Sequence, residues 1–475
     1  MIFSSPVFLF AFCPVFFIVL FCIPHTAIRV KNAWIVIGSL LFYAWGAGKF
    51  TVVVLGTLLL DYYLGSAIAK KGNNSRLFVA IDVVMNLGIL LYFKYFNFFI
   101  ENINAVLSRI GMEAISFTSV VLPLGVSFVV FQKMTYCLDI ARGNSKPAEH
   151  YFHLVEYLLL FPQIVAGPIV KYSEIAAQIK GRLVKKADFL YGFRRFSVGM
   201  FKKVWIADVV AQIADTVFLA QAVELIPIDY AWIGAIAYTF QIFFDFSAYS
   251  DMAIGMLAIM GFHIGENFNQ PYTALSVTDF WKRWHISMTS WFREYLYIPL
   301  GGNRKGTART YLNLWIVFLL SGFWHGAAFN FIFWGAYHGL LLCIERGGLL
   351  KRMKKVPRII RSMGTFLLVM IGWIFFRVDT VGQGFSYLAN LFNPASYYTH
   401  LSSIYILTID PREWFIFALA AVICFLPLWE EAYGWIEKKA RSLPTLCHIG
   451  TLILFFLAAM KVITGAISPF IYFRF

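Results

Sequence analysis

Apolar runs long enough to form membrane helices recur along the whole chain, separated by short polar stretches. A helix that crosses the roughly 30 Å of hydrocarbon in a bilayer needs about 20 predominantly apolar residues. Some runs are too short or too polar for this, so we expect about eleven transmembrane helices plus re-entrant or interfacial helices buried in protein. The runs fall near residues 7–24, 33–48, 51–69, 77–99, 116–139, 152–169, 192–220, 230–261, 311–328, 330–344, 363–377, 413–430 and 449–468. The predicted fold class is an all-α polytopic integral membrane protein.

The composition agrees with a bilayer as the solvent. Hydrophobic residues make up 60% of the 475 residues, and only 14% are charged, which is far from the balance of a soluble protein. No soluble domain is visible, so residues 1–475 are expected to form a single membrane domain. The six cysteines have neither paired nor metal-ligand spacing and predict no disulfide framework.

The net charge of +15 is spread between the apolar runs rather than gathered into a patch. This distribution follows the positive-inside rule and argues against a nucleic-acid partner. No basic region precedes the first run and no cleavage pattern follows it, so we expect it to be retained as a helix. Basic clusters at 29–31, 70–76, 142–146, 346–361 and 438–441 then mark inner loops and place both termini outside.

Two segments carry unusual polar chemistry. Residues 276–306 mix charged and aromatic side chains, which predicts a short amphipathic helix at the inner interface, ending near Pro299. This helix would bring His285 into the protein from the cytoplasmic side. Residues 311–344 predict an apolar hairpin, broken at 321–322 and at Gly326, with His325 at the break. The core histidine region is therefore 276–344.

An ionisable side chain at membrane depth is a functional-site hypothesis by default. A neutral imidazole suits acyl transfer, because it can remove a hydroxyl proton while the oxygen attacks an acyl carbonyl, a step worth about 10²–10⁴ in rate. The alternative for His325 is a buried ring bonded to a backbone carbonyl. His285 could equally be an interfacial histidine beside Trp284, and His338 is interpreted as a packing or hydrogen-bonding residue.

Two carboxylates, Asp245 and Asp251, lie inside an apolar segment. They could orient a histidine or form ion pairs with Lys or Arg, and pairing is the simpler interpretation because an isolated charge there is too costly. The two histidines have no neighbours at ligand spacing, so the sequence predicts no metal site.

At these residues the sequence resembles the membrane-bound O-acyltransferase superfamily, particularly its bacterial branch of alginate O-acetyltransferases. The motifs that carry this resemblance are 279–304, 322–328 and 334–339, supported by 123–128, 161–168 and 244–251. The resemblance implies that His325 is the principal catalytic histidine, with His285 facing it across a tunnel between the membrane faces. It also implies acetyl-CoA as the donor at the inner face. Lys282, Arg283 and Arg304 are candidates to bind the CoA phosphates, although interfacial anchoring would also explain these charges.

The outward helix and the tail are expected within 449–475. The tail itself, 469–475, resembles the F-x-Y-x-x-F ending of the small companion peptide in lipoteichoic-acid D-alanylation. This implies that Tyr472 accepts the acetyl group and passes it to a serine of an extracytoplasmic transferase. The alternative is that the tail is an aromatic anchor, with Arg474 at the lipid headgroups.

The expected function is therefore O-acetylation of an exopolysaccharide or cell-wall glycan from the bacterial cytoplasmic membrane. No Gly-rich serine motif is present, so a serine-esterase-like partner would complete the transfer. Two alternatives remain: D-alanyl transfer from a carrier protein in teichoic-acid modification, and transport of an acyl donor without chemistry.

Overall fold

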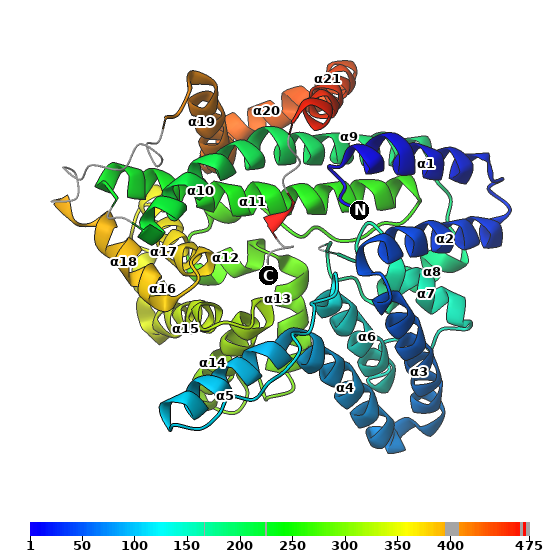
Figure 1. The fold of residues 1–475 in the computed structure, drawn as a ribbon. Coiled ribbons are helices and arrows are strands. Elements are labelled where there is room, and N and C mark those ends of the chain that lie inside the picture. Colours follow the sequence, from blue (N-terminus) through cyan, green and yellow to red (C-terminus); the bar gives the residue numbers. More distant parts are fainter. Residues whose placement is uncertain (166, 224–225, 395–407, 466–468, 472–475) are drawn as a thin grey trace. The chain divides into compact units, whose positions relative to one another are not determined.

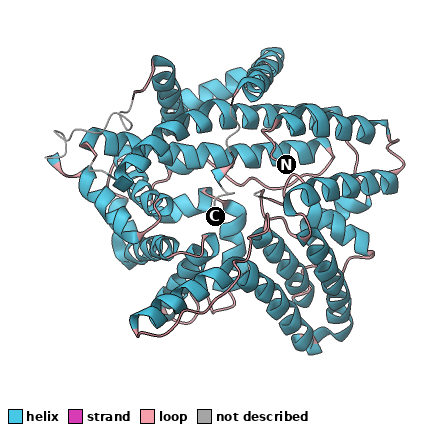
Figure 2. Ribbon diagram, viewed as in Figure 1, coloured by secondary structure: helices cyan, strands magenta, loops and turns pink. Residues whose placement is uncertain are grey.

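The computed structural model describes residues 1–165, 167–223, 226–394, 408–465 and 469–471. All regular secondary structure in these residues is helical (Figure 2). The all-α prediction is therefore confirmed. The described chain divides into two compact units, one formed by 1–196 with 253–265 and the other by 197–252 with 266–475. The expectation of a single domain stays a prediction.

The first unit is built from the N-terminal helices (Figure 1). It contains α1 (Cys13–Cys22), α2 (Ile28–Ala47), α3 (Phe50–Lys71), α4 (Arg76–Leu90), α5 (Phe96–Arg109), α6 (Val126–Ala141), α7 (Tyr151–Leu159), α8 (Tyr172–Lys180), the start of α9 (Lys186–Phe201) and the end of α11 (Ile228–Ile259).

The second unit contains the rest of α9 and α11 and all of the later helices. These are α10 (Asp208–Val223), α12 (Val277–Arg283), α13 (Ile286–Phe292), α14 (Thr307–His325), α15 (Phe329–Ile344), α16 (Leu350–Met353), α17 (Arg358–Arg377), α18 (Val381–Leu391), α19 (Pro411–Phe425), α20 (Glu430–Ser442) and α21 (Pro444–Thr464). Short π-helical turns adjoin helices of both units, at Phe8–Phe12 and Leu91–Tyr95 in the first and at Lys202–Ala207, Arg293–Tyr297 and Glu345–Leu349 in the second.

By length and composition, seven helices of the described chain could cross a membrane. They are Phe50–Lys71, Arg76–Arg109, Lys186–Ala222, Ile228–Ile259, Arg358–Arg377, Pro411–Leu428 and Pro444–Thr464. Two runs expected to be long segments are shorter in the structure. In the run 116–139 the helix begins only at Val126, after Pro123 and a left-handed Gly125, and in the run 152–169 it ends at Leu159.

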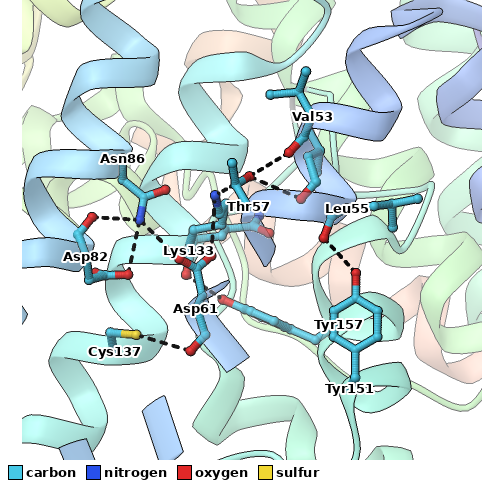
Figure 3. A network of polar contacts seen from close by, with 12 residues as sticks. Val53, Leu55, Thr57, Asp61, Asp82, Asn86, Lys133, Cys137, Tyr151 and Tyr157 are labelled. Atoms are coloured by element: carbon cyan, nitrogen blue, oxygen red, sulfur yellow. Dashed lines mark hydrogen bonds and ion pairs between the residues drawn. The ribbon is translucent and has the colours of Figure 1, made fainter. Parts of the chain in front are cut away.

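A buried polar network ties three helices of the first unit together (Figure 3). The Lys133 ammonium on α6 lies 3.3 Å from the Asp61 carboxylate on α3 and donates a 2.7 Å hydrogen bond to Thr57. On α4, the Asn86 amide donates to Asp82 at 3.1 Å and to Asp61 at 3.4 Å. Lys133, Asp61, Asp82 and Asn86 are all at most 1% exposed. Because isolated charges are costly at membrane depth, this network holds α3, α4 and α6 side by side.

In the second unit, α14 and α15 form the predicted hairpin and touch through two glycines. A Cβ atom on Gly322 would clash with the carbonyl oxygen of Phe331, and one on Gly335 would clash with the carbonyl oxygen of Phe318. The close backbone approach expected at Gly322 is therefore confirmed.

The expected break at 321–322 is wrong. The helix α14 continues through these residues to His325, because the missing side chain of Gly322 is used for packing against α15 and not for a turn. The chain leaves the helix only at Gly326, which has an extended backbone.

Candidate active site

His285 is fully buried between two short helices, α12 and α13. Its backbone has φ 44° and ψ 56°, in the left-handed region that side chains other than glycine rarely adopt. Such a conformation costs about 1–3 kcal/mol and persists only where the surroundings enforce it. The single amphipathic helix expected over 276–306 is thus wrong in detail, because this turn divides it at the histidine.

Asn267 holds both the turn and the imidazole. Its side-chain oxygen accepts hydrogen bonds from the backbone N–H of Ser287 at 3.2 Å and the Ser287 hydroxyl at 2.9 Å, and it lies 3.2 Å from Nδ1 of His285. A backbone N–H can only donate, so the amide atom at this position is the oxygen. Nδ1 of His285 must then carry the hydrogen that it donates to Asn267. In the neutral ring, the lone pair is therefore on Nε2.

The helix α11 supports this arrangement from a second side. The rings of Phe246 and His285 are perpendicular with centroids 4.7 Å apart, and the Asn267 amide donates to the Ser250 hydroxyl at 3.2 Å. Burial lowers the pKa of His285 to about 3. The imidazole is consequently neutral near pH 7, which is the form that a general base requires.

Glu345 fixes the beginning of α12. Its carboxylate accepts hydrogen bonds from the backbone N–H groups of Val277 at 2.6 Å and Thr278 at 2.8 Å, and from the Thr278 hydroxyl at 2.6 Å. Ser276 adds a side-chain cap by accepting from the N–H of Asp279 at 3.0 Å. A carboxylate at the N-terminus of a helix also interacts favourably with the helix dipole. These contacts locate α12, which ends two residues before His285.

His325 is the last residue of α14 and is 7% exposed. Its ring contacts Trp334 at a centroid distance of 5.1 Å and Phe376 at 5.2 Å, both nearly perpendicular to it, and also contacts the adjacent Trp324. Aromatic edges and faces on several sides restrict the orientation of the imidazole. The ring is therefore presented by the end of a helix within an aromatic enclosure.

The two histidines adjoin one aromatic cluster, made of Trp284, Trp373 and Trp334. Trp284 directly precedes His285 and lies 4.9 Å from Trp373, which stacks on Trp334 at 5.8 Å. Trp334 in turn contacts His325. The structure thus brings both predicted histidines to the same packed cluster of the second unit. Their placement across a tunnel stays a prediction.

The predicted cofactor-binding cations differ in their surroundings. Arg283 is half-buried and bonds to Asp279 on its own helix at 2.9 Å. Lys282 and Arg304 are exposed. The third predicted catalytic residue, Tyr472, lies outside the described residues.

Both carboxylates considered in the sequence form ion pairs. Asp245 lies 2.6 Å from the Lys203 ammonium, and Asp251 lies 2.7 Å from that of Lys202. The pairing prediction is confirmed for both. Sequence reasoning missed Asn267 and Glu345, because neither lies near the histidines in sequence or belongs to a motif whose chemistry points to them.

A model of the membrane-bound O-acyltransferase family matches residues 148–378, which include His285, His325 and Glu345. The probable alginate O-acetylase AlgI of Azotobacter vinelandii is 36% identical over 506 residues, covering all of both chains. The chain belongs to the membrane-bound O-acyltransferase family. The family expected from the motifs is thereby confirmed, and the chain is a membrane protein and an acyltransferase.

Two further relatives of this acyltransferase extend the comparison. The probable alginate O-acetylase AlgI of Pseudomonas putida is 41% identical over 384 residues, 80% of this chain and 78% of the relative. The peptidoglycan O-acetyltransferase of Helicobacter pylori is 35% identical over 425 residues, 82% of this chain and 80% of the relative.

Proposed function

We propose that this acyltransferase takes acetyl from cytoplasmic acetyl-CoA and moves it across the bacterial cytoplasmic membrane for O-acetylation of a polysaccharide. The observation that carries the proposal is the buried, neutral His285, fixed by Asn267 and joined through the tryptophan cluster to His325. The names of the relatives support acetyl as the acyl group and a glycan as the acceptor. Both chain termini would lie outside.

The chemistry follows from a hydroxyl acceptor beside an imidazole. The acceptor O–H loses its proton to the imidazole, its oxygen attacks the thioester carbonyl, the C–S bond breaks, and CoA leaves as the thiol with that proton. His325 is the proposed principal base, with His285 as its companion. The exposed Lys282 and Arg304, together with Arg283, would hold the CoA phosphates through charge-assisted contacts.

Tyr472 is the proposed acceptor of this first step. A phenol ionises near pH 10, well below an alkyl alcohol, so it is easier to deprotonate and its ester is more readily transferred. The acetyl group would then pass to a serine of an extracytoplasmic esterase-like partner, and from there to the polysaccharide.

The test is the intact mass of the C-terminal peptide after the purified protein has been incubated with acetyl-CoA. We expect acetyl on Tyr472 in the wild type, its loss in Tyr472→Phe, and a fall of about 10²–10⁴ in CoA release in His325→Gln. The control is His448→Gln, which removes an exposed histidine on α21.

Each alternative gives a different result. An unchanged rate of CoA release in His325→Gln would overturn the catalytic role and favour a transporter. Modification of Tyr472 by D-alanine from a carrier-protein thioester, but not by acetyl-CoA, would replace acetyl with D-alanyl. CoA release by the wild type without acetyl on Tyr472 would keep the acyltransferase but exclude the tyrosine relay.

A further inference from the structure

We propose that Lys203 and Asp245 form a docking site for the protein's own C-terminal segment, and that this site presents the tail to the histidines. The presentation step rests on the proposed tyrosine relay, whereas the docking site stands on contacts within the second unit. The segment concerned is 469–471, which Figure 1 shows beside α11.

Two side chains bind the backbone of this segment. The N–H of Ile471 donates a 2.6 Å hydrogen bond to Oδ2 of Asp245, and the Lys203 ammonium donates to the carbonyl oxygen of Pro469 at 3.3 Å. One donor and one acceptor of the tail are therefore satisfied by a buried ion pair. Contacts of this kind bind an extended peptide largely independently of its side chains.

The side chain of Phe470 supplies the apolar part of the contact. The Lys203 ammonium lies 4.6 Å from the centroid of the Phe470 ring, and Tyr249 meets the same ring at 5.2 Å and nearly perpendicular to it. Phe470 is 1% exposed and Ile471 is 4% exposed. A residue that anchored the tail among lipid headgroups would lie on the surface, so the burial of these residues favours docking over anchoring.

The charges around Lys203 explain how the tail stabilises the docking site. Lys203 lies 2.6 Å from Oδ1 of Asp245 and 2.8 Å from Asp208, so one cation serves two carboxylates. The second oxygen of Asp245 receives its hydrogen bond from Ile471 instead. A buried carboxylate is costly when its oxygens lack hydrogen-bond donors. The N–H of the tail therefore supplies the donor to Asp245 that the ion pair alone does not provide.

The docking site adjoins the candidate active site through α11. Phe246, which follows Asp245, contacts the ring of His285, and Ser250 accepts from Asn267. A single stretch of helix, 245–250, therefore supports both the tail and the companion histidine. Holding Ile471 at this stretch fixes the chain one residue before Tyr472 and reduces the conformational search of the acceptor hydroxyl.

The experiment measures docking and transfer separately in the full-length protein. Hydrogen–deuterium exchange of the C-terminal peptide, resolved to the Ile471 amide, reports docking whether or not any acetyl is transferred. Acetyl on Tyr472 reports the relay. We expect Asp245→Ala to accelerate exchange at Ile471 roughly tenfold or more, because a hydrogen bond to a charged group is lost, and to reduce acetyl on Tyr472 by a similar factor.

A second variant avoids any loss of folding caused by a disrupted ion pair. Phe470→Ala leaves Lys203, Asp208 and Asp245 intact but removes the buried ring, and we expect the same two changes. The control, Glu437→Ala, removes an exposed carboxylate on α20 and should alter neither measurement.

The outcomes distinguish the two proposals. Unchanged exchange at Ile471 in both Asp245→Ala and Phe470→Ala would overturn the docking site. Faster exchange with undiminished acetyl on Tyr472 would overturn its role in presenting the tail. Faster exchange in a protein whose wild type never acetylates Tyr472 would leave the docking site standing and refute the relay.

Discussion

The side-chain oxygen of Asn267 lies 3.2 Å from Nδ1 of His285 and determines which nitrogen of that ring carries the hydrogen. The same oxygen bonds to the backbone of the next turn, so the tautomer of the imidazole and its left-handed backbone have a common cause. A histidine prepared in this way can accept a proton only at Nε2. The arrangement is a means of orienting a base without placing a charge beside it.

Replacing Asn267 with Asp should change the pH dependence of the enzyme. In the wild type, burial lowers the pKa of His285, so the ring stays neutral between about pH 5 and 8. A carboxylate beside Nδ1 favours the protonated ring and raises this pKa. We therefore expect the acidic limb of the profile of CoA release against pH to move to higher pH in Asn267→Asp. Superimposable profiles for the two proteins would show that His285 takes no part in the reaction.

Replacing Glu345 with Ala should destabilise the protein and lower its activity. The change leaves the N–H groups of the buried Val277 and the half-buried Thr278 without their acceptor, and the buried donor alone costs about 1–3 kcal/mol. Thermal unfolding in detergent measures the loss. Glu437→Ala, at an exposed site, should stay within about 0.5 kcal/mol of the wild type. Equal unfolding temperatures for the two variants would contradict the role assigned to Glu345.

Adding a methyl group at Gly322 should separate α14 from α15. The new Cβ meets the carbonyl oxygen of Phe331, and overpacking of this kind costs about 1–3 kcal/mol. CoA release should fall as well, because His325 follows on the same helix. Gly364→Ala is the matched control, since its Cβ meets open space and should be neutral or slightly stabilising. If Gly322→Ala behaved like Gly364→Ala in both assays, the close helix contact would be refuted.

Removing the cation from the polar network of the first unit should be strongly destabilising. Lys133→Met leaves the Asp61 carboxylate buried without its partner, which costs about 3–5 kcal/mol. The double variant Lys133→Met, Asp61→Asn should recover most of that loss in a thermal unfolding assay. Lys180→Met breaks an exposed ion pair with Glu149 and should cost at most about 1 kcal/mol. A double variant no more stable than Lys133→Met alone would argue against direct pairing.

The sequence was sufficient for the features that depend on local composition. Apolar runs predicted the helical class, and polar residues within them pointed to His285 and His325 as exceptions that needed an explanation. The cost of an isolated charge in an apolar helix correctly predicted that Asp245 and Asp251 would be paired. None of these inferences required knowledge of which helices touch.

The remaining features depend on contacts between residues far apart in the chain. Glu345 follows the backbone groups that it binds by nearly 70 positions, and no pattern near α12 predicts it. Helical periodicity gave no sign that the chain turns at His285. The left-handed backbone conformation there is enforced by the hydrogen bonds of Asn267 and is not one that histidine itself prefers. Gly322 was correctly expected to permit close approach, but sequence could not distinguish packing from a bend.

The polar network around Lys133 also constrains how the protein enters the membrane. The carboxylates of Asp61 on α3 and Asp82 on α4 are synthesised before Lys133 on α6, which pairs with Asp61. An unpaired Asp at the centre of a membrane helix costs about 2.5–3.5 kcal/mol during insertion. The helices α3 and α4 are therefore unstable in lipid by themselves. They insert stably only once α6 has been made. Assembly of this three-helix network is therefore cooperative, because α6, the last of its three helices to be made, completes it.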